Sequence, residues 1–194
     1  MPPKTRFTRE EIVAAALDLV RHSGPEAVTA RGVAGALGAS AKVIFGLFPS
    51  MEALLEAVMA SGEALYQARL AQAMSAGEYP RYKASGMAYI AFARQEKHLF
   101  QWLFMRDRTG EPLTEQRDQV RPILKVIQEN TGLSEEAAYR FHLEVWVCIH
   151  GIAAMIATGH LDWDPDFVDR MLTDVYLGMK NRYCEEKAHE SHPN

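Results

Sequence analysis

The sequence predicts an all-α protein of about nine helices: an N-terminal three-helix domain with a helix-turn-helix, followed by a larger C-terminal helical bundle that pairs as a homodimer. Apolar residues recur at helical spacing along most of the 194 residues. No segment shows the alternation of apolar and polar residues that is typical of a strand. Turn residues such as Gly24, Pro25 and Gly38 divide the first 50 residues into short segments, and these segments predict the N-terminal domain.

The first helix is marked at both of its ends. Thr8 followed by Glu11 has the spacing of a capping box, so we expect the helix to begin at Arg9. The stretch 23–25, Ser-Gly-Pro, should end it. This helix would support the two shorter ones that follow.

The next two segments have the pattern of a helix-turn-helix. Thr29 is the expected N-cap of a helix of about two turns that ends at Gly38. Ser40 is the expected N-cap of a third short segment over 41–47. Two short helices joined by a tight turn with a glycine are typical of this motif.

Longer helices should form the remainder of the chain. Ser50 caps the first of them, and Pro165 lies at the favoured first position of the last. We expect a helix-turn-helix domain over 1–50, a bundle domain over 51–184 and a frayed, disordered tail over 185–194. The helices expected after residue 50 cover 50–74, 80–96, 97–106, 114–130, 134–158 and 165–183.

Charge is distributed unevenly along the chain, whose net charge is −4. Residues 1–50 carry six basic and four acidic side chains, whereas the rest carries fifteen basic and twenty-one acidic ones. A mildly basic head on an acidic body has the polarity expected if only the head meets phosphate. The excess of two positive charges is too small to decide the question.

The composition also predicts the compartment and excludes several classes of protein. The N-terminus lacks the apolar core of a signal peptide, and the two cysteines form no disulfide framework, so we expect a cytoplasmic protein. The uncharged stretch 145–161 is interpreted as a buried helix, with no membrane partner. No phosphate loop, nucleophile elbow or HExxH motif occurs, which predicts a protein that is not an enzyme and needs no cofactor. His142, His150 and Cys148 lack the spacing of a metal site.

The segment 134–158 is apolar on nearly every side, so it must be covered all round. We expect its own bundle to cover one side and a second copy of the chain to cover the other. The residues predicted at this dimer interface are Ile149, Ile152 and Ile156, with Phe167, Met171, Val175 and Met179 from the last helix.

Two aromatic groups are candidates for a ligand pocket. His142, Trp146 and His150 recur every four residues and share one helical face. Both this face and an aromatic concentration earlier in the chain are consistent with two interpretations, a pocket wall or packing in the core. As a pocket, the two groups would hold a small, largely apolar effector. The residues taken from the earlier group are Tyr89, Phe92, Trp102 and Met105.

The run 8–59 resembles the N-terminal domain of TetR/AcrR-type transcriptional regulators. The resemblance rests on Gly24-Pro25-Glu26-Ala27-Val28-Thr29, Leu37-Gly38-Ala39-Ser40, Phe45-Gly46-Leu47-Phe48-Pro49-Ser50 and Glu52-Ala53-Leu54-Leu55. Further on, Trp146 with His150-Gly151 is similar to the Trp…His-Gly signature of one C-terminal subclass of that family.

The resemblance implies a ligand-responsive repressor, an all-α homodimer whose short third helix enters the major groove of a pseudo-palindromic operator in double-stranded DNA. An effector bound in the C-terminal domain would alter the spacing of the two DNA-reading heads. Carried over by position, the residues at or near DNA are Thr29, Arg31, Ser40, Ala41, Lys42, Phe45 and Ser50.

The chain departs from the family pattern near the expected DNA contacts. The family usually has Tyr at the position of Phe45, often His at Leu47, Lys at Met51 and Gly at Lys42. Phe45 and Met51 would remove two phosphate contacts per subunit, and Lys42 would add a cation. An alternative is therefore a relative with weakened DNA binding that acts mainly through a protein partner.

Overall fold

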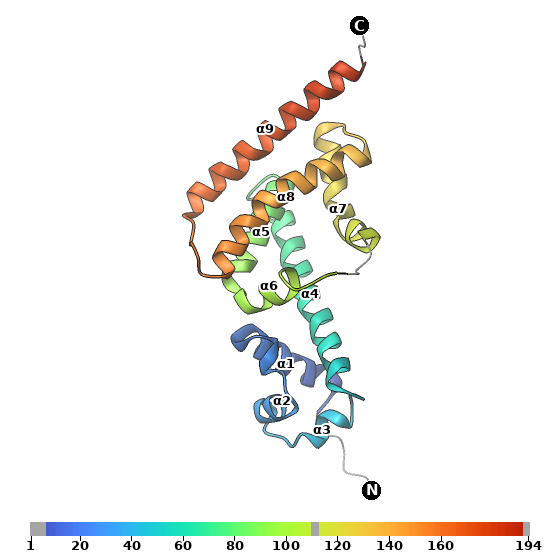
Figure 1. Ribbon diagram of the computed structural model, residues 1–194, viewed down its shortest axis with the longest axis vertical. Coiled ribbons are helices and arrows are strands. Elements are labelled where there is room, and N and C mark those ends of the chain that lie inside the picture. The colour runs from blue at the N-terminus through green and yellow to red at the C-terminus, as the bar shows by residue number, and fades with distance from the viewer. Residues whose placement is uncertain (1–6, 110–112, 192–194) are drawn as a thin grey trace. The chain divides into compact units, whose positions relative to one another are not determined.

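The computed structural model describes residues 7–109 and 113–191, and every regular element within those ranges is a helix (Figure 1). The all-α class predicted from the sequence is confirmed. In chain order the helices are α1 (Arg9–Ser23), the 3-10 helix η1 (Pro25–Ala27), α2 (Ala30–Leu37), α3 (Lys42–Phe45), α4 (Met51–Ala76), α5 (Arg81–Gln95), α6 (Lys97–Phe104), α7 (Leu113–Thr131), α8 (Glu135–Ala157) and α9 (Pro165–Ser191).

The described chain divides into two compact units. Unit 1 contains residues 7–68 and 95–106, and unit 2 contains the rest. Unit 1 is larger than the domain expected over 1–50, because it also includes the first two thirds of α4 and all of α6.

The core of unit 1 explains why α4 and α6 belong to it. Gly62 of α4 lies where three helices approach one another: a Cβ atom there would stand 2.9 Å from Leu99 Cδ1 of α6 and 3.7 Å from Leu17 Cδ1 of α1. Three short helices alone bury too little apolar surface to be stable, and α4 and α6 supply the remainder. The fully buried side chains of this unit are Ile12, Ala16, Val20, Val33, Ile44, Leu54, Val58, Leu99 and Phe100.

Polar side chains fix the helix ends in unit 1, largely as the sequence predicts. The capping box at Thr8 is confirmed, and the Thr29 hydroxyl accepts a hydrogen bond from the Gly32 amide at 3.0 Å. The Ser50 hydroxyl accepts one from the Ala53 amide at 3.2 Å.

The prediction for Ser40 was wrong. The side chain of Ser40 does not cap α3, which begins at Lys42 with Ala41 as its N-cap residue. The Ser40 carbonyl instead accepts the Val43 amide at 3.0 Å, so the segment expected over 41–47 starts as a turn and contains only four helical residues.

An ion pair joins α1 to the start of α6. The Arg21 guanidinium donates to both carboxylate oxygens of Glu96, at 2.8 Å each. The Glu96 side chain is nearly buried, whereas a third of the Arg21 side chain is exposed, where it also reaches Asp18 at 3.1 Å. The hydrogen bonds to Glu96 raise the pKa of Arg21, so the pair stays charged at any physiological pH.

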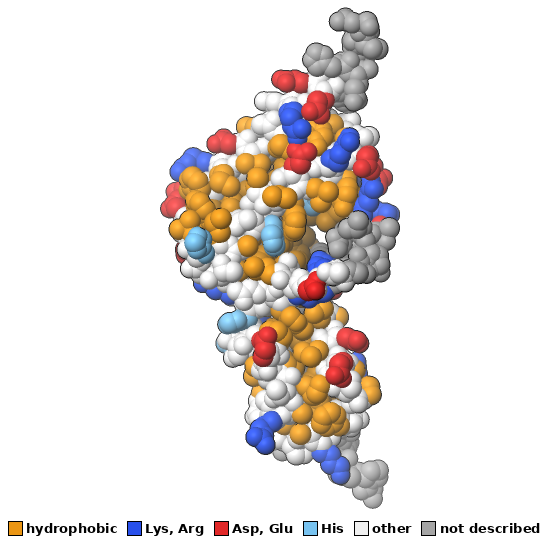
Figure 2. All heavy atoms as spheres, in the orientation of Figure 1, with side chains coloured by type: hydrophobic (Ala, Val, Ile, Leu, Met, Phe, Trp, Pro, Cys, Tyr) orange, Lys and Arg blue, Asp and Glu red, His pale blue; other side chains and the backbone are white. Residues whose placement is uncertain are grey.

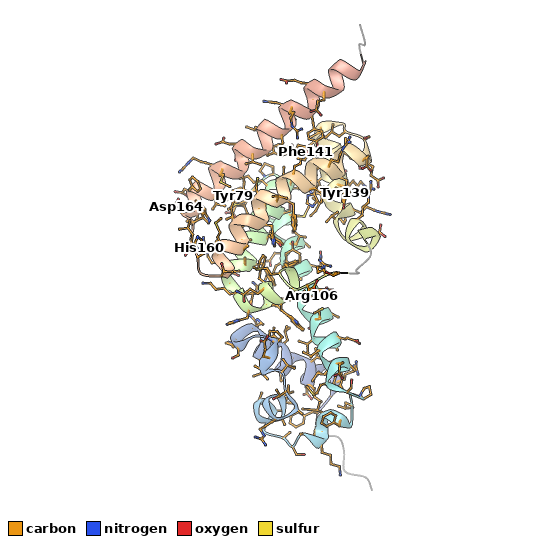
Figure 3. All side chains as sticks on the ribbon, in the orientation of Figure 1. Tyr79, Arg106, Tyr139, Phe141, His160 and Asp164 are labelled. Atoms are coloured by element: carbon orange, nitrogen blue, oxygen red, sulfur yellow. The ribbon has the colours of Figure 1, made fainter. Side chains whose placement is uncertain are left out.

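Unit 2 is a helical bundle with α8 at its core. Phe141 of α8 is fully buried (Figure 3). Its ring centroid lies 6.0 Å from that of Tyr82 on α5, 5.7 Å from that of Tyr176 and 5.6 Å from that of Tyr183 on α9. These aromatic contacts hold α8 against both α5 and α9.

Ion pairs hold α5 at both of its ends. Near the start of α5, the Lys83 ammonium lies 2.7 Å from an oxygen of Asp169 on α9. Near its end, the Arg94 guanidinium donates to the Trp163 carbonyl at 2.8 Å and pairs with Asp162 at 2.9 Å, both in the loop before α9. Ion pairs therefore stabilise the bundle in addition to its apolar packing.

One described helix, α8, is long and apolar enough to cross a membrane by length and composition. Nine of its side chains are buried within unit 2. The core helix of a helical bundle has the same composition, so the interpretation of this stretch as a buried helix stands.

The last helix extends beyond its predicted end. We expected it to stop at residue 183 and a frayed tail to cover 185–194, but α9 continues to Ser191. Residues 185–188, Glu-Glu-Lys-Ala, are all good helix formers, and Arg182 pairs with Glu186 one turn on at 3.5 Å. Residues 192–194 lie outside the described residues.

The Arg21 pair makes an asymmetric prediction for stability. Arg21→Ala leaves a buried carboxylate without its bidentate partner and should lower the free energy of unfolding by about 2 to 3 kcal/mol. Glu96→Ala leaves a guanidinium that water can still reach, so its effect should be smaller. Urea unfolding of the two variants measures both. The matched control is Arg121→Ala, which removes an exposed pair with Asp118 and should change stability by less than about 1 kcal/mol. Equal losses in all three variants would contradict this account.

Candidate functional site

The turn between α2 and α3 presents the candidate DNA-facing surface of unit 1. Gly38 ends α2 in the left-handed conformation, with a φ of 60°. The Ala39 amide then donates to the Ala34 carbonyl at 2.9 Å, which closes the end of α2 and redirects the chain into α3. The geometry is that of a helix-turn-helix with a very short second helix.

Four of the seven residues predicted at DNA are exposed polar or aromatic side chains of this turn and its helices: Arg31, Ser40, Lys42 and Phe45. Phe45 is 52% exposed, an unusual position for an aromatic side chain without a partner molecule. In the part of the chain that the structure describes, Arg31 and Lys42 have no ion-pair partner, so both cations are available to phosphate.

The other three predicted residues have local roles. Thr29 and Ser50 cap α2 and α4 with their hydroxyl groups. Ala41 is half-buried at the N-cap position of α3. Free amides at a capped helix N-terminus can bind phosphate without a side-chain charge.

Two buried side chains hold α3 in place. Ile44, in the middle of α3, has no exposed surface, and the Phe48 side chain just beyond it is 1% exposed. The Phe48 amide donates to the Ile44 carbonyl at 2.8 Å. Lys42 and Phe45 lie on other faces of α3 and are both exposed while Ile44 is buried.

Arg9 is a functional candidate that the sequence did not single out. Its guanidinium lies 4.1 Å from the centre of the Phe48 ring and donates to the Leu47 carbonyl at 3.3 Å. The cation therefore braces the segment that follows α3. No sequence signal reveals this contact, since 38 residues separate Arg9 from Leu47.

The seven residues predicted for a ligand pocket are divided between the two units. Trp102 and Met105 belong to unit 1, and the other five belong to unit 2. In unit 2, the Tyr89 hydroxyl lies 2.9 Å from Nδ1 of His150, on which the Trp146 ring stacks at a centroid distance of 4.8 Å. Phe92 is buried in the core, and so is His142, whose Nδ1 lies 3.3 Å from the Tyr82 hydroxyl.

A cavity of about 310 Å³ does occur in unit 2, but none of those seven residues lines it. The seven residues therefore stay a prediction, and this cavity is a separate candidate for a ligand site. The cavity is lined by Pro80, Tyr82, Lys83 and Gly86 of α5 and the turn before it, Asn130 of α7, Val145 and Ile149 of α8, and Leu172, Thr173, Tyr176 and Leu177 of α9.

Three residues predicted at a dimer interface are instead core residues of unit 2. Ile149, Ile152 and Ile156 are 7%, 4% and 2% exposed, so their side chains pack in the core of their own chain. Phe167 is exposed on α9, while Met171, Val175 and Met179 are half-buried. The large apolar side chains that α8 exposes are Leu143, Val147 and Met155.

Exposed apolar side chains gather on the face of unit 2 over α8 and α9 (Figure 2). Val147, at 64% exposed, is the most exposed of them. Few charged side chains interrupt the patch in this view. Exposed apolar patches on a folded chain are typical of protein interfaces.

A metal centre finds no support in the described ranges, because no three His, Cys, Asp or Glu side chains lie close enough together to hold an ion. Cys148 and Cys184 are both free thiols.

Comparison with protein families decides the identity of the fold. Residues 12–58 match the model of bacterial regulatory proteins of the tetR family, and residues 82–175 match that of the tetracyclin repressor-like C-terminal domain. The chain belongs to the TetR family. It is therefore a DNA-binding transcriptional regulator, with the helix-turn-helix in the first matched region. Membership of the Trp…His-Gly subclass stays a prediction.

Solved structures show the same fold. A protein from Vibrio parahaemolyticus, described as a TetR-family transcriptional regulator, is 22% identical and matches with a TM-score of 0.56 over 88% of this chain and 97% of its own. A protein from Pseudomonas aeruginosa PAO1, described as a transcriptional regulator, is 17% identical and matches with a TM-score of 0.64 over 94% and 96%. A search of curated proteins finds no match.

Buried His142 predicts how the stability of this TetR-family protein depends on pH. Burial lowers the pKa of His142 from 6.5 to about 4. Between those values the unfolded chain takes up a proton that the folded chain does not, so stability should fall as the pH decreases from 6.5 toward 4, by about 3 kcal/mol for this group. His142→Leu should flatten this part of the profile, measured by urea unfolding at several pH values. His160→Gln, which removes an exposed histidine of unit 2, is the control, and a His142→Leu profile parallel to that of the wild type would contradict the assignment.

Proposed function

We propose that this TetR-family regulator is a ligand-responsive repressor that acts in the cytoplasm as a homodimer on a pseudo-palindromic operator in double-stranded DNA. It regulates by occupying the operator and catalyses no reaction. The observation that carries the proposal is the exposed surface of α2 and α3, where Arg31, Lys42 and Phe45 face outward around the buried anchor Ile44. This surface has the cations and the rigidity that reading a groove requires.

Each residue of the surface receives a distinct role in the proposal. Lys42, as the first residue of α3, reaches a phosphate or a guanine edge, and Ser40 and Ala41 lie nearest to it. Arg31 in the first turn of α2 faces the sugar-phosphate backbone, as do the capped helix ends at Thr29 and Ser50. Phe45 supplies an apolar contact in place of the hydrogen bond that a tyrosine would make.

Exposed Phe45 also favours a second candidate function. A large apolar side chain on the DNA-facing surface, with Met51 where the family usually has a lysine, fits a regulator that binds DNA weakly and acts mainly through a protein partner. The two candidates differ in operator affinity, and in how that affinity depends on salt.

Lys42→Ala tests the DNA surface directly. If Lys42 reads a base, operator affinity should fall by about 1 to 3 kcal/mol, with relaxed preference at one position per half-site. If it binds phosphate, affinity for all sequences should fall alike, and the salt slope should flatten by about one unit per contact. Fluorescence anisotropy with operator DNA over a salt series measures both quantities.

Two further variants complete that experiment. Met51→Lys restores a cation at the first residue of α4 and should tighten binding, with a steeper salt slope. Lys125→Ala removes an exposed lysine of unit 2 and is the control. Indistinguishable titrations for all four proteins would show that another face meets DNA, and a wild type that binds no operator at low salt would favour the protein-partner function.

The homodimer is proposed to use the exposed patch of α8 together with Phe167 and the half-buried face of α9 formed by Met171, Val175 and Met179. Two helices per subunit would then form a four-helix interface. Because Val147 is 64% exposed on this patch, it would become buried in the dimer.

Val147→Asp tests the interface. A carboxylate buried without a partner is costly, so the dimer dissociation constant should rise at least about tenfold. Sedimentation velocity over a concentration series measures it. Lys125→Asp is the control. It introduces an aspartate at an exposed position of α7 and should leave the dimer dissociation constant unchanged. A wild type that sediments as a monomer at micromolar concentration would refute the dimer, and a Val147→Asp protein that dimerises normally would refute this interface.

A further inference from the structure

The cavity in unit 2 has the dimensions and walls of a small-molecule site. Its volume of about 310 Å³ lies at the lower end of the range found for ligand pockets, about 300 to 1,000 Å³. Val145, Ile149 and Leu172 form buried apolar walls. Asn130 and Leu177 are exposed and line the entrance. A hollow with apolar walls and an exposed entrance can exchange a ligand with solvent.

Gly86 creates part of this hollow. It lies in the middle of α5, where a Cβ atom would stand 3.0 Å from Ile149 Cδ1 and 3.4 Å from Leu172 Cδ1, and both of those residues are walls of the cavity. A glycine inside a helix is unfavourable relative to alanine. The missing side chain therefore leaves space that packing alone would fill.

Lys83, the one charged residue among the described residues of the lining, is already neutralised. The Lys83 ammonium lies 2.7 Å from a carboxylate oxygen of Asp169 and donates to the Thr173 hydroxyl at 2.8 Å. Among the described residues that line the cavity, none is acidic. A cationic ligand would meet Lys83 and no counter-charge, and an anionic ligand would bring a second negative charge beside Asp169 in a poorly solvated place.

Phenol groups supply the polar contacts. Burial raises the pKa of Tyr82 and of Tyr176, so both hydroxyls stay neutral. The Tyr82 hydroxyl lies 3.3 Å from Nδ1 of His142. A phenol hydroxyl can both donate and accept a hydrogen bond, so Tyr82 can bind a ligand group as well as the histidine.

We propose that this cavity is the effector site, and that it takes an uncharged, largely apolar molecule with one hydrogen-bonding group, such as a hydroxyl or an amide, directed at Tyr82. Binding of a ligand in the cavity does not depend on the function proposed above. Only the effect of that ligand on DNA binding rests on the proposed ligand response. The selectivity against charge follows from the Lys83–Asp169 pair, and the upper limit on ligand size follows from Gly86 facing Ile149.

Three probes that share one ring system test the selectivity. Full-length protein is titrated by calorimetry with 2-naphthalenemethanol, 2-naphthoate and 2-naphthylmethylammonium, which are neutral, anionic and cationic at pH 7. The neutral probe should bind at least about tenfold more tightly than either ion. Binding of an ion that equals or exceeds that of the neutral probe would overturn the proposal, and so would no binding of the neutral probe.

Matched glycine variants locate the site. Gly86→Ala should weaken binding of the neutral probe several-fold, because its methyl group meets two walls of the cavity. Gly178→Ala makes the same change in α9, where nothing lies within 4 Å of the added carbon, and should bind like the wild type. Circular dichroism confirms that both variants are folded. Ile149→Ala widens the cavity and should improve the affinity for 2-anthracenemethanol relative to that for the naphthalene probe. Equal affinities of the two glycine variants for the naphthalene probe would exclude this cavity as its site.

Operator binding measured on the same preparations separates this proposal from the proposed function. If the neutral probe binds but leaves operator affinity unchanged, the cavity is a binding site and the ligand response fails. If the operator is not bound at all, the DNA-binding proposal fails, while the probe titrations still decide the cavity.

Discussion

The burial of Ile44 is the constraint on which the candidate DNA-facing surface depends. A helix of four residues cannot sustain itself, because forming the first turn orders several residues for one hydrogen bond. α3 therefore keeps its shape only because Ile44 has no exposed surface and Phe48 follows it into the same core, with Arg9 braced against the Phe48 ring. The positions of Lys42 and Phe45 are fixed by packing beneath them. Changes in the core of unit 1 should consequently move Lys42 and Phe45 without touching any residue at the surface.

Local chemistry explains which features could be predicted from the sequence. Thr8, Thr29 and Ser50 cap helices through partners three residues away, so their roles are encoded in short stretches of sequence. The family resemblance over 8–59 is of the same kind. Ser40 has the right residue type for a cap, yet α3 begins at Lys42 with Ala41 as its N-cap residue, and Ile44 in that helix is buried. The sequence pattern alone does not show where α3 begins.

The candidate site of unit 2 depends on which faces the chain covers with its own helices. Ile149 and Val147 are both apolar and two residues apart on α8, but Ile149 packs in the core and Val147 faces outward. A helix that is apolar all round gives no sign of which side is which. The cavity is harder still to predict. Aromatic residues such as Phe92 are the usual candidates for a pocket wall, but this cavity is lined by Gly86 and by Lys83, whose charge is paired with Asp169.

At Gly86, the stability of helix α5 and the volume of the cavity favour different residues. Alanine in the interior of a helix is favoured over glycine by about 1 kcal/mol, and here the added methyl group would also contact the flexible ends of Ile149 and Leu172. A library screened only for heat resistance should therefore enrich alanine at this position and yield sturdier proteins with a smaller cavity beside α5. Selection for thermal tolerance and selection for an open cavity would favour different residues at the same codon.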